Sequence, residues 1–166
     1  NISHKTVDIS NWIFKDEEDD HTFTIPQGTI LNTKDYLVLC ENAEDFSNTY
    51  PNILNYNGNF NFGLGRTDII RLFDTNNKLI DSVAYSNTAP WDANADSTGY
   101  SLELNKFNID NNNPLNWYAS FVYGGTPGEL NSEYESVDEP EKENDIYFTC
   151  YPNPLNDYSV IEYAVP

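Results

Sequence analysis

The chain has 166 residues, of which 27 are Asp or Glu and 8 are Lys or Arg, giving a formal net charge of -19 and a pI of about 4.1. Binding to nucleic acids or anionic membranes depends mainly on basic side chains, so this balance argues against both. Neither a run of about 18 apolar residues nor a signal peptide is present, so we expect no membrane insertion, and we expect the numbering to start inside a longer precursor.

Short runs of alternating apolar and polar residues recur along the first 123 residues, and they are rich in β-branched and aromatic side chains. This pattern predicts β-strands. In chain order, the expected strands are VDISNWIF (7–14), TFTI (22–25), YLVLC (36–40), DIIRLF (68–73), LIDSVAY (79–85), YSLEL (100–104) and WYASFVY (117–123).

Connectors such as NYNGN and DNNNP favour turns, because Asn, Asp and Gly tolerate turn conformations. The segment 43–50 is expected to form at most one helical turn, and no longer helical pattern occurs. Many short strands at this spacing predict an antiparallel β-sandwich or barrel. The alternation predicts eight core residues, namely Trp12, Leu37, Leu39, Ile70, Leu72, Val83, Leu102 and Trp117.

The pattern divides the chain into three parts. Residues 1–131 form the expected sandwich domain. Residues 132–145 are acidic and almost without apolar side chains, which predicts a linker. Residues 146–166 return to strand patterning but are too few for a core of their own, so we interpret them as the truncated start of a second domain.

The first 131 residues resemble the lamin tail domain through VDISNW (7–12), DYLVLC (35–40), FGLGRTDIIRLFD (62–74), LIDSVAY (79–85), GYSLEL (99–104) and GTPGELN (125–131). The resemblance implies an immunoglobulin-like antiparallel β-sandwich. It also implies one further strand before residue 1, which the chain as numbered lacks. The eukaryotic members bind DNA, and the charge of -19 argues against that activity here.

The tail YPNPLNDYSVIEYAVP (151–166) resembles the opening of the C-terminal sorting domain of type IX secretion. The resemblance implies that the protein is secreted or displayed on the outer cell surface. In such bacterial proteins, lamin tail domains accompany other modules as non-catalytic attachments, including spore-coat kinase-like (CotH) domains and nucleases.

Two loops carry the oxygen ligands that calcium prefers. Asp92, Asn94 and Asp96 occupy alternate positions, which resembles the start of an EF-hand loop, but position six is Ser97 instead of Gly and no helix flanks the segment. We weigh a weak calcium site there against an ordinary turn. The acidic run 16–20 and the stretch 110–114 are interpreted as solvated turns.

Trp91 follows Pro90 in a loop, whereas Trp12 and Trp117 lie in strands and are expected to face the core. Trp91 is therefore the candidate for an exposed sugar-stacking ring. Cys40 and Cys150 are interpreted either as small buried side chains or as a disulfide.

Catalytic motifs of hydrolases, metalloproteases and redox proteins do not occur, and we expect no enzyme and no cofactor other than the calcium considered above. The leading hypothesis is a non-catalytic interaction module whose partner is an extracellular protein or glycan. A carbohydrate-binding module is the alternative, and part of a hydrolase is the second alternative. We further hypothesise that residues 158–164 add as a strand to the sandwich edge, within the chain or in a strand-swapped dimer.

Overall fold

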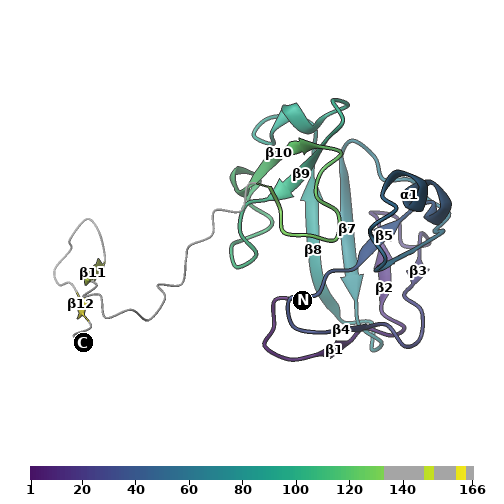
Figure 1. Ribbon diagram of the computed structural model, residues 1–166, viewed down its shortest axis with the longest axis horizontal. Helices are drawn as coiled ribbons and strands as arrows, with labels where there is room; N and C mark the ends of the chain where they lie inside the picture. The colour runs from purple at the N-terminus through teal and green to yellow at the C-terminus, as the bar shows by residue number, and fades with distance from the viewer. Residues whose placement is uncertain (133–147, 152–159, 164–166) are drawn as a thin grey trace. The chain divides into compact units, whose positions relative to one another are not determined.

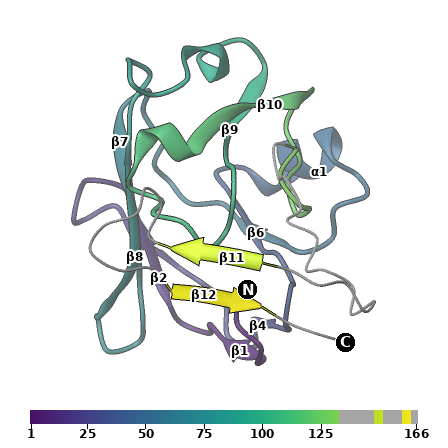
Figure 2. The same ribbon diagram turned by 90° about the vertical axis from the view of Figure 1, so that its left-hand side faces the viewer.

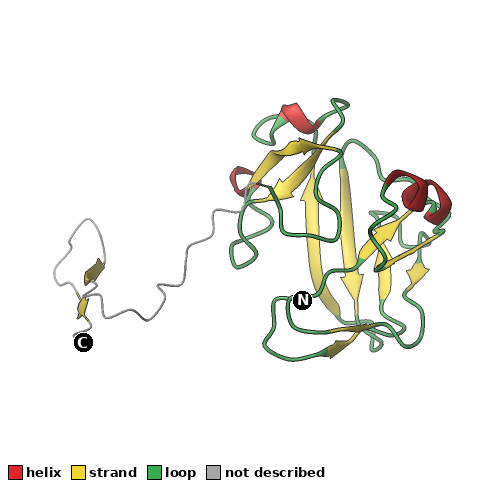
Figure 3. Cartoon of the chain, in the orientation of Figure 1, coloured by secondary structure: helices red, strands yellow, loops and turns green. Residues whose placement is uncertain are grey.

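The computed structural model describes residues 1–132 in full and the backbone of residues 148–151 and 160–163 (Figure 1). The chain divides into two units, residues 1–135 and residues 136–166. Strands and loops make up most of the first unit, as Figure 3 shows. No helix of the described residues is long and apolar enough to cross a membrane.

The largest sheet of the first unit has four antiparallel strands in the order β3-β2-β7-β8. Its strands are β2 (Ile13–Lys15), β3 (Phe23–Thr24), β7 (Asp68–Phe73) and β8 (Leu79–Tyr85). Ile70 is paired with Val83 in the register of β7 and β8, which lie side by side in Figures 1 and 2. The register places predicted core residues of both strands on one face of the sheet.

The other strands of the unit form pairs. β1 (Val7–Asp8) is antiparallel to β4 (Ile30–Leu31), and β9 (Tyr100–Leu104) is antiparallel to β10 (Trp117–Tyr123). β5 (Val38–Cys40) runs parallel to β6 (Tyr56–Gly58). The helices are short: α1 (Ala43–Thr49) and the 3-10 turns η1 (Ala93–Ala95) and η2 (Pro114–Asn116).

Aromatic side chains form the centre of the core. Phe14, Phe60 and Phe62 are buried together, with Phe23, Leu39 and Ile70 packed against them. The ring centroids of Phe60 and Phe62 lie 4.7 Å apart, and those of Phe14 and Phe60 lie 5.5 Å apart. Of the eight predicted core residues, Val83 is buried, the other seven are half-buried and none is exposed, so the depth of burial was overestimated.

The predicted fold class, an immunoglobulin-like antiparallel β-sandwich, is confirmed, and all seven predicted strands are present in part or in full. The predicted strand 7–14 is not continuous. It is interrupted at Asn11, which adopts φ 60°, and forms the two short strands β1 and β2. The amide of Asn11 donates to Ile25 O at 2.9 Å, and the chain turns between β1 and β2. The helix α1 is longer than the single turn expected, because Asn42 caps it by accepting from Glu44 N and Asp45 N.

Strand β6 was not predicted, because Asn and Gly favour turns and the segment NYNGN contains both. The strand forms because it pairs with β5, where a Cβ at Gly58 would lie 2.5 Å from Cys40 O. Only glycine permits that approach. Cys40 carries a free thiol, and the side chain of Cys150 lies outside the described residues.

In the second unit, β11 (Phe148–Tyr151) pairs with β12 (Val160–Tyr163) in an antiparallel hairpin. Val160–Tyr163 therefore has a strand partner within its own unit, a pairing that the sequence pattern does not predict. Most of the predicted linker, and residues 158, 159 and 164 of the predicted added strand, lie outside the described residues.

Candidate functional site

The β9–β10 ribbon contains an irregularity that changes which side chains reach solvent. Ala119 is paired with Leu102 and Tyr123 with Tyr100, so β10 advances four residues where β9 advances two. The two additional residues must bulge out of the ladder. This bulge lies at Ser120, Phe121 and Val122, in the part of β10 nearest its end.

Hydrogen bonds from side chains hold the bulge in place. Ser120 is buried, and its Oγ accepts from Ser101 N at 3.0 Å and donates to Val122 O at 2.8 Å. The amide of Phe121 donates to Ser132 Oγ at 2.8 Å. These bonds replace ladder bonds that the bulge interrupts, so the irregular backbone has defined partners.

The bulge exposes a group of apolar side chains that we call the aromatic surface, made of Tyr100, Phe121, Val122 and Tyr123. Phe121 is 73% exposed and Tyr123 is 76% exposed. Tyr100 and Tyr123 meet edge to face, with ring centroids 5.7 Å apart and planes at 79°. A Cβ at Gly99 would lie 2.3 Å from Tyr123 Cε2, so the Tyr123 ring rests directly on a glycine backbone. Exposed apolar patches of this kind are typical of binding surfaces.

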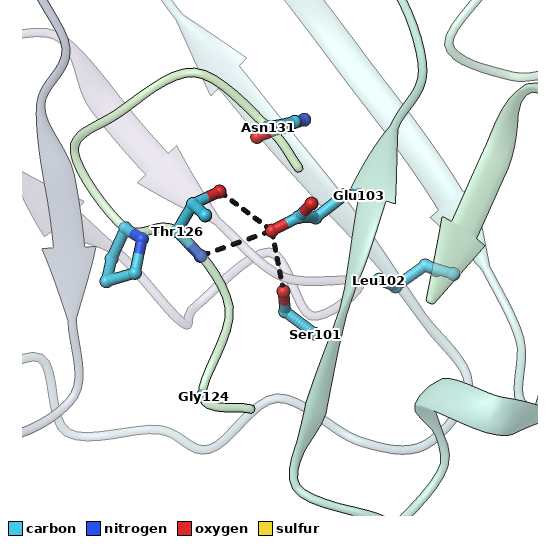
Figure 4. A pocket seen from close by; sticks show the side chains of 7 residues that line it. Ser101, Leu102, Glu103, Gly124, Thr126 and Asn131 are labelled. Carbon is cyan, nitrogen blue, oxygen red and sulfur yellow. Dashed lines mark hydrogen bonds between the residues drawn. The ribbon is translucent and has the colours of Figure 1, made fainter. Parts of the chain in front are cut away.

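The carboxylate of Glu103 anchors the loop that follows β10 (Figure 4). Its Oε1 accepts from Ser101 Oγ at 3.1 Å and from Thr126 N and Oγ1 at 3.2 and 2.8 Å. Its Oε2 accepts from Ser132 N at 2.7 Å and Ser132 Oγ at 2.6 Å. A small cavity of about 190 Å³ lies beside it, lined by Ser101, Leu102, Glu103, Gly124, Thr126, Pro127 and Asn131.

The charge of Glu103 is maintained by these donors. Burial raises the pKa of this carboxyl group, but the hydrogen bonds from Ser132, Thr126 and Ser101 outweigh burial and hold the pKa below its usual value. All five donated bonds come from neutral groups, so the carboxylate keeps its negative charge beneath the ribbon. Because both of its oxygens are occupied, Glu103 acts as a structural anchor of the 124–132 loop.

Side chains of Asp92 and Ser132 accept hydrogen bonds from amides on the edge of β10 that is not paired with β9. Asp92 Oδ2 accepts from Ala119 N at 3.0 Å, and Ser132 Oγ accepts from Phe121 N. The hydrogen bonds from Ala119 N and Asn94 N hold the pKa of Asp92 below its usual value. Two amides that would otherwise be offered to an added strand are therefore already bonded.

The three predicted calcium ligands lie close in sequence, but the carboxylate oxygens of Asp92 and Asp96 bond to the protein. Asp92 Oδ1 accepts from Asn94 N and Nδ2 at 2.9 Å and caps η1. Asp96 Oδ2 accepts from Asn87 Nδ2 at 3.2 Å, and its Oδ1 lies 3.3 Å from Arg66 Nε. In the described part of the chain, no group of three or more His, Cys, Asp or Glu is arranged to hold a metal ion.

Trp91 is buried, 9% exposed, and the expectation of an accessible ring is wrong. Its ring centroid lies 6.0 Å from that of Trp117. The amide of Trp91 closes a turn by donating to Thr88 O at 3.1 Å, and the ring packs against the half-buried Trp117. A ring in this position offers little face to a sugar.

The acidic run 16–20 is only partly the solvated turn that was expected. Glu17, Glu18, Asp19 and Asp20 are exposed, but Asp16 is 3% exposed and accepts from His21 Nδ1 at 2.7 Å. Arg71 donates through Nε to Asp16 O at 2.8 Å and through Nη1 to Asp19 Oδ1 at 2.9 Å. The stretch 110–114 is a turn as predicted, in which Asn113 caps η2.

The sequence did not predict the anchoring roles of Glu103 and Ser132 or the exposure of Phe121. Glu103 follows Leu102, a predicted core residue, so alternation places it on the opposite face of β9, and Phe121 lies in a strand where alternation predicts an inward ring. The signal that was present is the Gly-Gly pair at 124–125 after β10, which marks an irregular strand end. Nothing local to Glu103 indicates that a loop more than twenty residues later will cover it.

A comparison with family models matches residues 1–87 to the family described as the lamin tail domain. No curated protein and no solved structure matches the chain. The matched segment ends before β9, so the aromatic surface and the Glu103 anchor lie beyond it.

Proposed function

Because the chain belongs to the lamin tail domain family, whose members are non-catalytic immunoglobulin-like modules, we propose that it is an interaction module of a larger secreted bacterial protein. The observation that carries this proposal is the aromatic surface. Phe121 and Tyr123 are more than 70% exposed on a ribbon whose backbone is otherwise well bonded. Solvent-exposed aromatic side chains on an ordered backbone are typical of binding hot spots.

An extracellular location is part of this proposal. Its support comes from the tail at 151–166, which resembles a type IX secretion sorting domain, and from the acidic segment before it. In that setting the module accompanies a second module, such as a spore-coat kinase-like (CotH) domain or a nuclease, and holds it at an outer surface. Probing intact cells with a protease tests this part, because a surface protein is cleaved without lysis.

The binding role is tested with the full chain and washed cells of the producing bacterium. The double variant Phe121→Ser with Tyr123→Ser removes both rings, and we expect roughly a tenfold loss of cell binding, as is usual for hot-spot residues. Leu54→Ser is the matched control, because Leu54 is 86% exposed and lies in a different loop. Equal binding by both variants and the wild-type protein would show that the aromatic surface is not the interaction site.

The same variants distinguish the alternative, a carbohydrate-binding module. Tyr and Phe rings also stack on sugars, so a glycan array on which the wild-type protein binds and the double variant does not would assign the partner to the glycans. Turnover of glycan or phosphodiester substrates by the chain would instead contradict the non-catalytic role.

A further inference from the structure

We infer that the partner of the aromatic surface is a cationic polypeptide segment, rich in Arg or Lys, which packs its charged side chains on the rings of Phe121 and Tyr123. This inference rests on the proposed function and names the chemistry of its ligand. It follows from three features of the ribbon: the exposed rings, the charge around them and the closed backbone edge.

Contacts hold the Tyr123 ring in place, and a hydrogen bond holds the backbone that carries Phe121. Tyr123 rests on Gly99 and meets Tyr100 edge to face, and the Phe121 amide is bonded to Ser132. Rings that are held in place lose little conformational freedom when a ligand binds. The faces of aromatic rings carry negative electrostatic potential, so they attract guanidinium and ammonium groups.

The charge of the segment that carries the rings is complementary to such a ligand. Residues 88–132 contain five acidic residues, Asp92, Asp96, Glu103, Asp110 and Glu129, and one basic residue, Lys106. Strands β9 and β10 contain no Lys or Arg. Arg66, which reaches the loop before β9, is paired with Asp96 and donates to Ser97 Oγ at 2.6 Å.

Two of these carboxylates, Glu103 and Asp92, bond to residues of the ribbon. In the part of the chain that the structure describes, the groups that donate hydrogen bonds to them are all neutral. Glu103 accepts from Ser101, Thr126 and Ser132, and Asp92 accepts from the amides of Ala119 and Asn94. Their hydrogen bonds keep the pKa of each below its usual value, so both are charged at neutral pH. Hydrogen bonds from neutral groups leave the net negative charge uncompensated, which favours a cation nearby.

The closed edge of β10 favours recognition by side chains over addition of a strand. Ala119 N and Phe121 N both bond to side chains of this chain. A peptide that added to this edge would have to break those bonds. A ligand that binds through its own charged side chains on the rings leaves them intact.

Calorimetry with a peptide of about ten arginines tests this inference, and a peptide of citrulline of the same length is the uncharged control of similar shape. The decisive variant is Phe121→Leu with Tyr123→Leu, which removes both rings, keeps large apolar side chains at both positions and leaves the charge of -19 unchanged. At about 0.15 M salt, where long-range attraction is screened, we expect arginine binding to weaken roughly tenfold in this variant. The citrulline peptide should bind neither protein measurably.

Each other outcome decides against the inference. Equal arginine binding by the variant and the wild-type protein means that attraction is to the overall charge only. Equal binding of the arginine and citrulline peptides by the wild-type protein means that charge is not recognised. A further outcome is that the double Leu variant binds the arginine peptide as the wild-type protein does, while the double Ser variant loses cell binding. In that case the proposed function stands and this inference fails.

Discussion

The buried carboxylate of Glu103 and the backbone amide of Phe121 share one partner, the hydroxyl of Ser132. Ser132 Oγ donates to Glu103 Oε2 at 2.6 Å and accepts from Phe121 N at 2.8 Å. A charged side chain in the interior thus fixes the backbone of an exposed aromatic residue through a single hydroxyl. The anchor and the aromatic surface are therefore expected to respond together to substitution.

Replacing the anchor should destabilise the first unit and loosen the bulge. In Glu103→Gln, the new side-chain NH2 group faces the donors of Thr126 and Ser132, so hydrogen bonds to the carboxylate are lost. Losing hydrogen bonds to a charged group should lower the free energy of unfolding by about 2–4 kcal/mol. Chemical denaturation measures this loss, and the Phe121 amide should exchange faster with deuterium. Glu129→Gln, in the exposed part of the same loop, should change neither quantity. Unchanged exchange at Phe121 in Glu103→Gln would contradict the link through Ser132.

Trp91 should behave as a core residue. Because it is buried against Trp117, Trp91→Ala is expected to lower the free energy of unfolding by about 3–5 kcal/mol. Leu115→Ala is the control, since Leu115 is 65% exposed and lies on η2, just before Trp117. A Trp91→Ala protein of normal stability that had lost binding to glycans would restore Trp91 as a ligand-stacking residue.

Alternation in the sequence was sufficient to predict that the segments DIIRLF and LIDSVAY are strands. Ile70 and Val83, which it predicts to face the core, lie opposite each other in the structure. The same rule failed for Glu103, because its side of β9 is covered by the loop containing Thr126 and Ser132. Alternation describes one strand at a time and contains no information on which later loop folds over it.

The errors at Trp91 and Tyr56–Gly58 have a related cause. A loop position after Pro90 suggests exposure, but the direction of the Trp91 side chain is set by its contact with Trp117, 26 residues later. Asn57 and Gly58 have low strand propensity, and they form a strand only because β5 supplies a partner. In both places a contact distant in sequence overrides the local preference.

The calcium prediction for Asp92, Asn94 and Asp96 can be decided by melting the protein in millimolar Ca²⁺ and in a chelator. A ligand that binds the native state must raise the melting temperature. Since Asp92 and Asp96 would first have to give up the hydrogen bonds described above, we expect no rise. Asp92→Asn should lower stability by about 1–2 kcal/mol in both buffers, because the cap of η1 and the Ala119 contact weaken. A rise in Ca²⁺ that is lost in Asp92→Asn would establish the site.

The strand-addition hypothesis for residues 158–164 is tested by deletion. In the described residues Val160–Tyr163 pairs with Phe148–Tyr151, so addition to a sandwich would use the remaining edge of this strand. If strand addition occurs, deletion of residues 146–166 lowers the melting temperature or converts a dimer to a monomer. Light scattering and thermal melting of the full and shortened chains provide the comparison. Unchanged mass together with unchanged melting would refute the hypothesis.

The pair of Asp16 and His21 predicts how stability depends on pH. The hydrogen bond to Asp16 raises the pKa of His21 above 6.5, and burial lowers it only in part. Burial raises the pKa of Asp16, but its hydrogen bonds to His21 and Glu18 N and the charges of His21 and Arg71 outweigh burial and bring the pKa below 3.8. Both groups therefore carry more charge between pH 3.8 and pH 6.5 than they would with their ordinary pKa values.

The sign of each contribution follows from these shifts. His21 stabilises the fold fully below pH 6.5, and its contribution is lost as the pH rises through the folded-state pKa. Asp16 contributes above pH 3.8, and its contribution is lost as the pH falls through its folded-state pKa. The guanidinium concentration at the unfolding midpoint, measured between about pH 5 and 9, should decrease as the pH rises through the folded-state pKa of His21. In His21→Gln this fall should be smaller, whereas His4→Gln should retain it, because His4 is exposed and lies outside the 16–21 loop. Parallel curves for the wild-type protein and His21→Gln would mean that the ion pair contributes nothing to stability in solution, despite the 2.7 Å contact between His21 Nδ1 and Asp16 Oδ2.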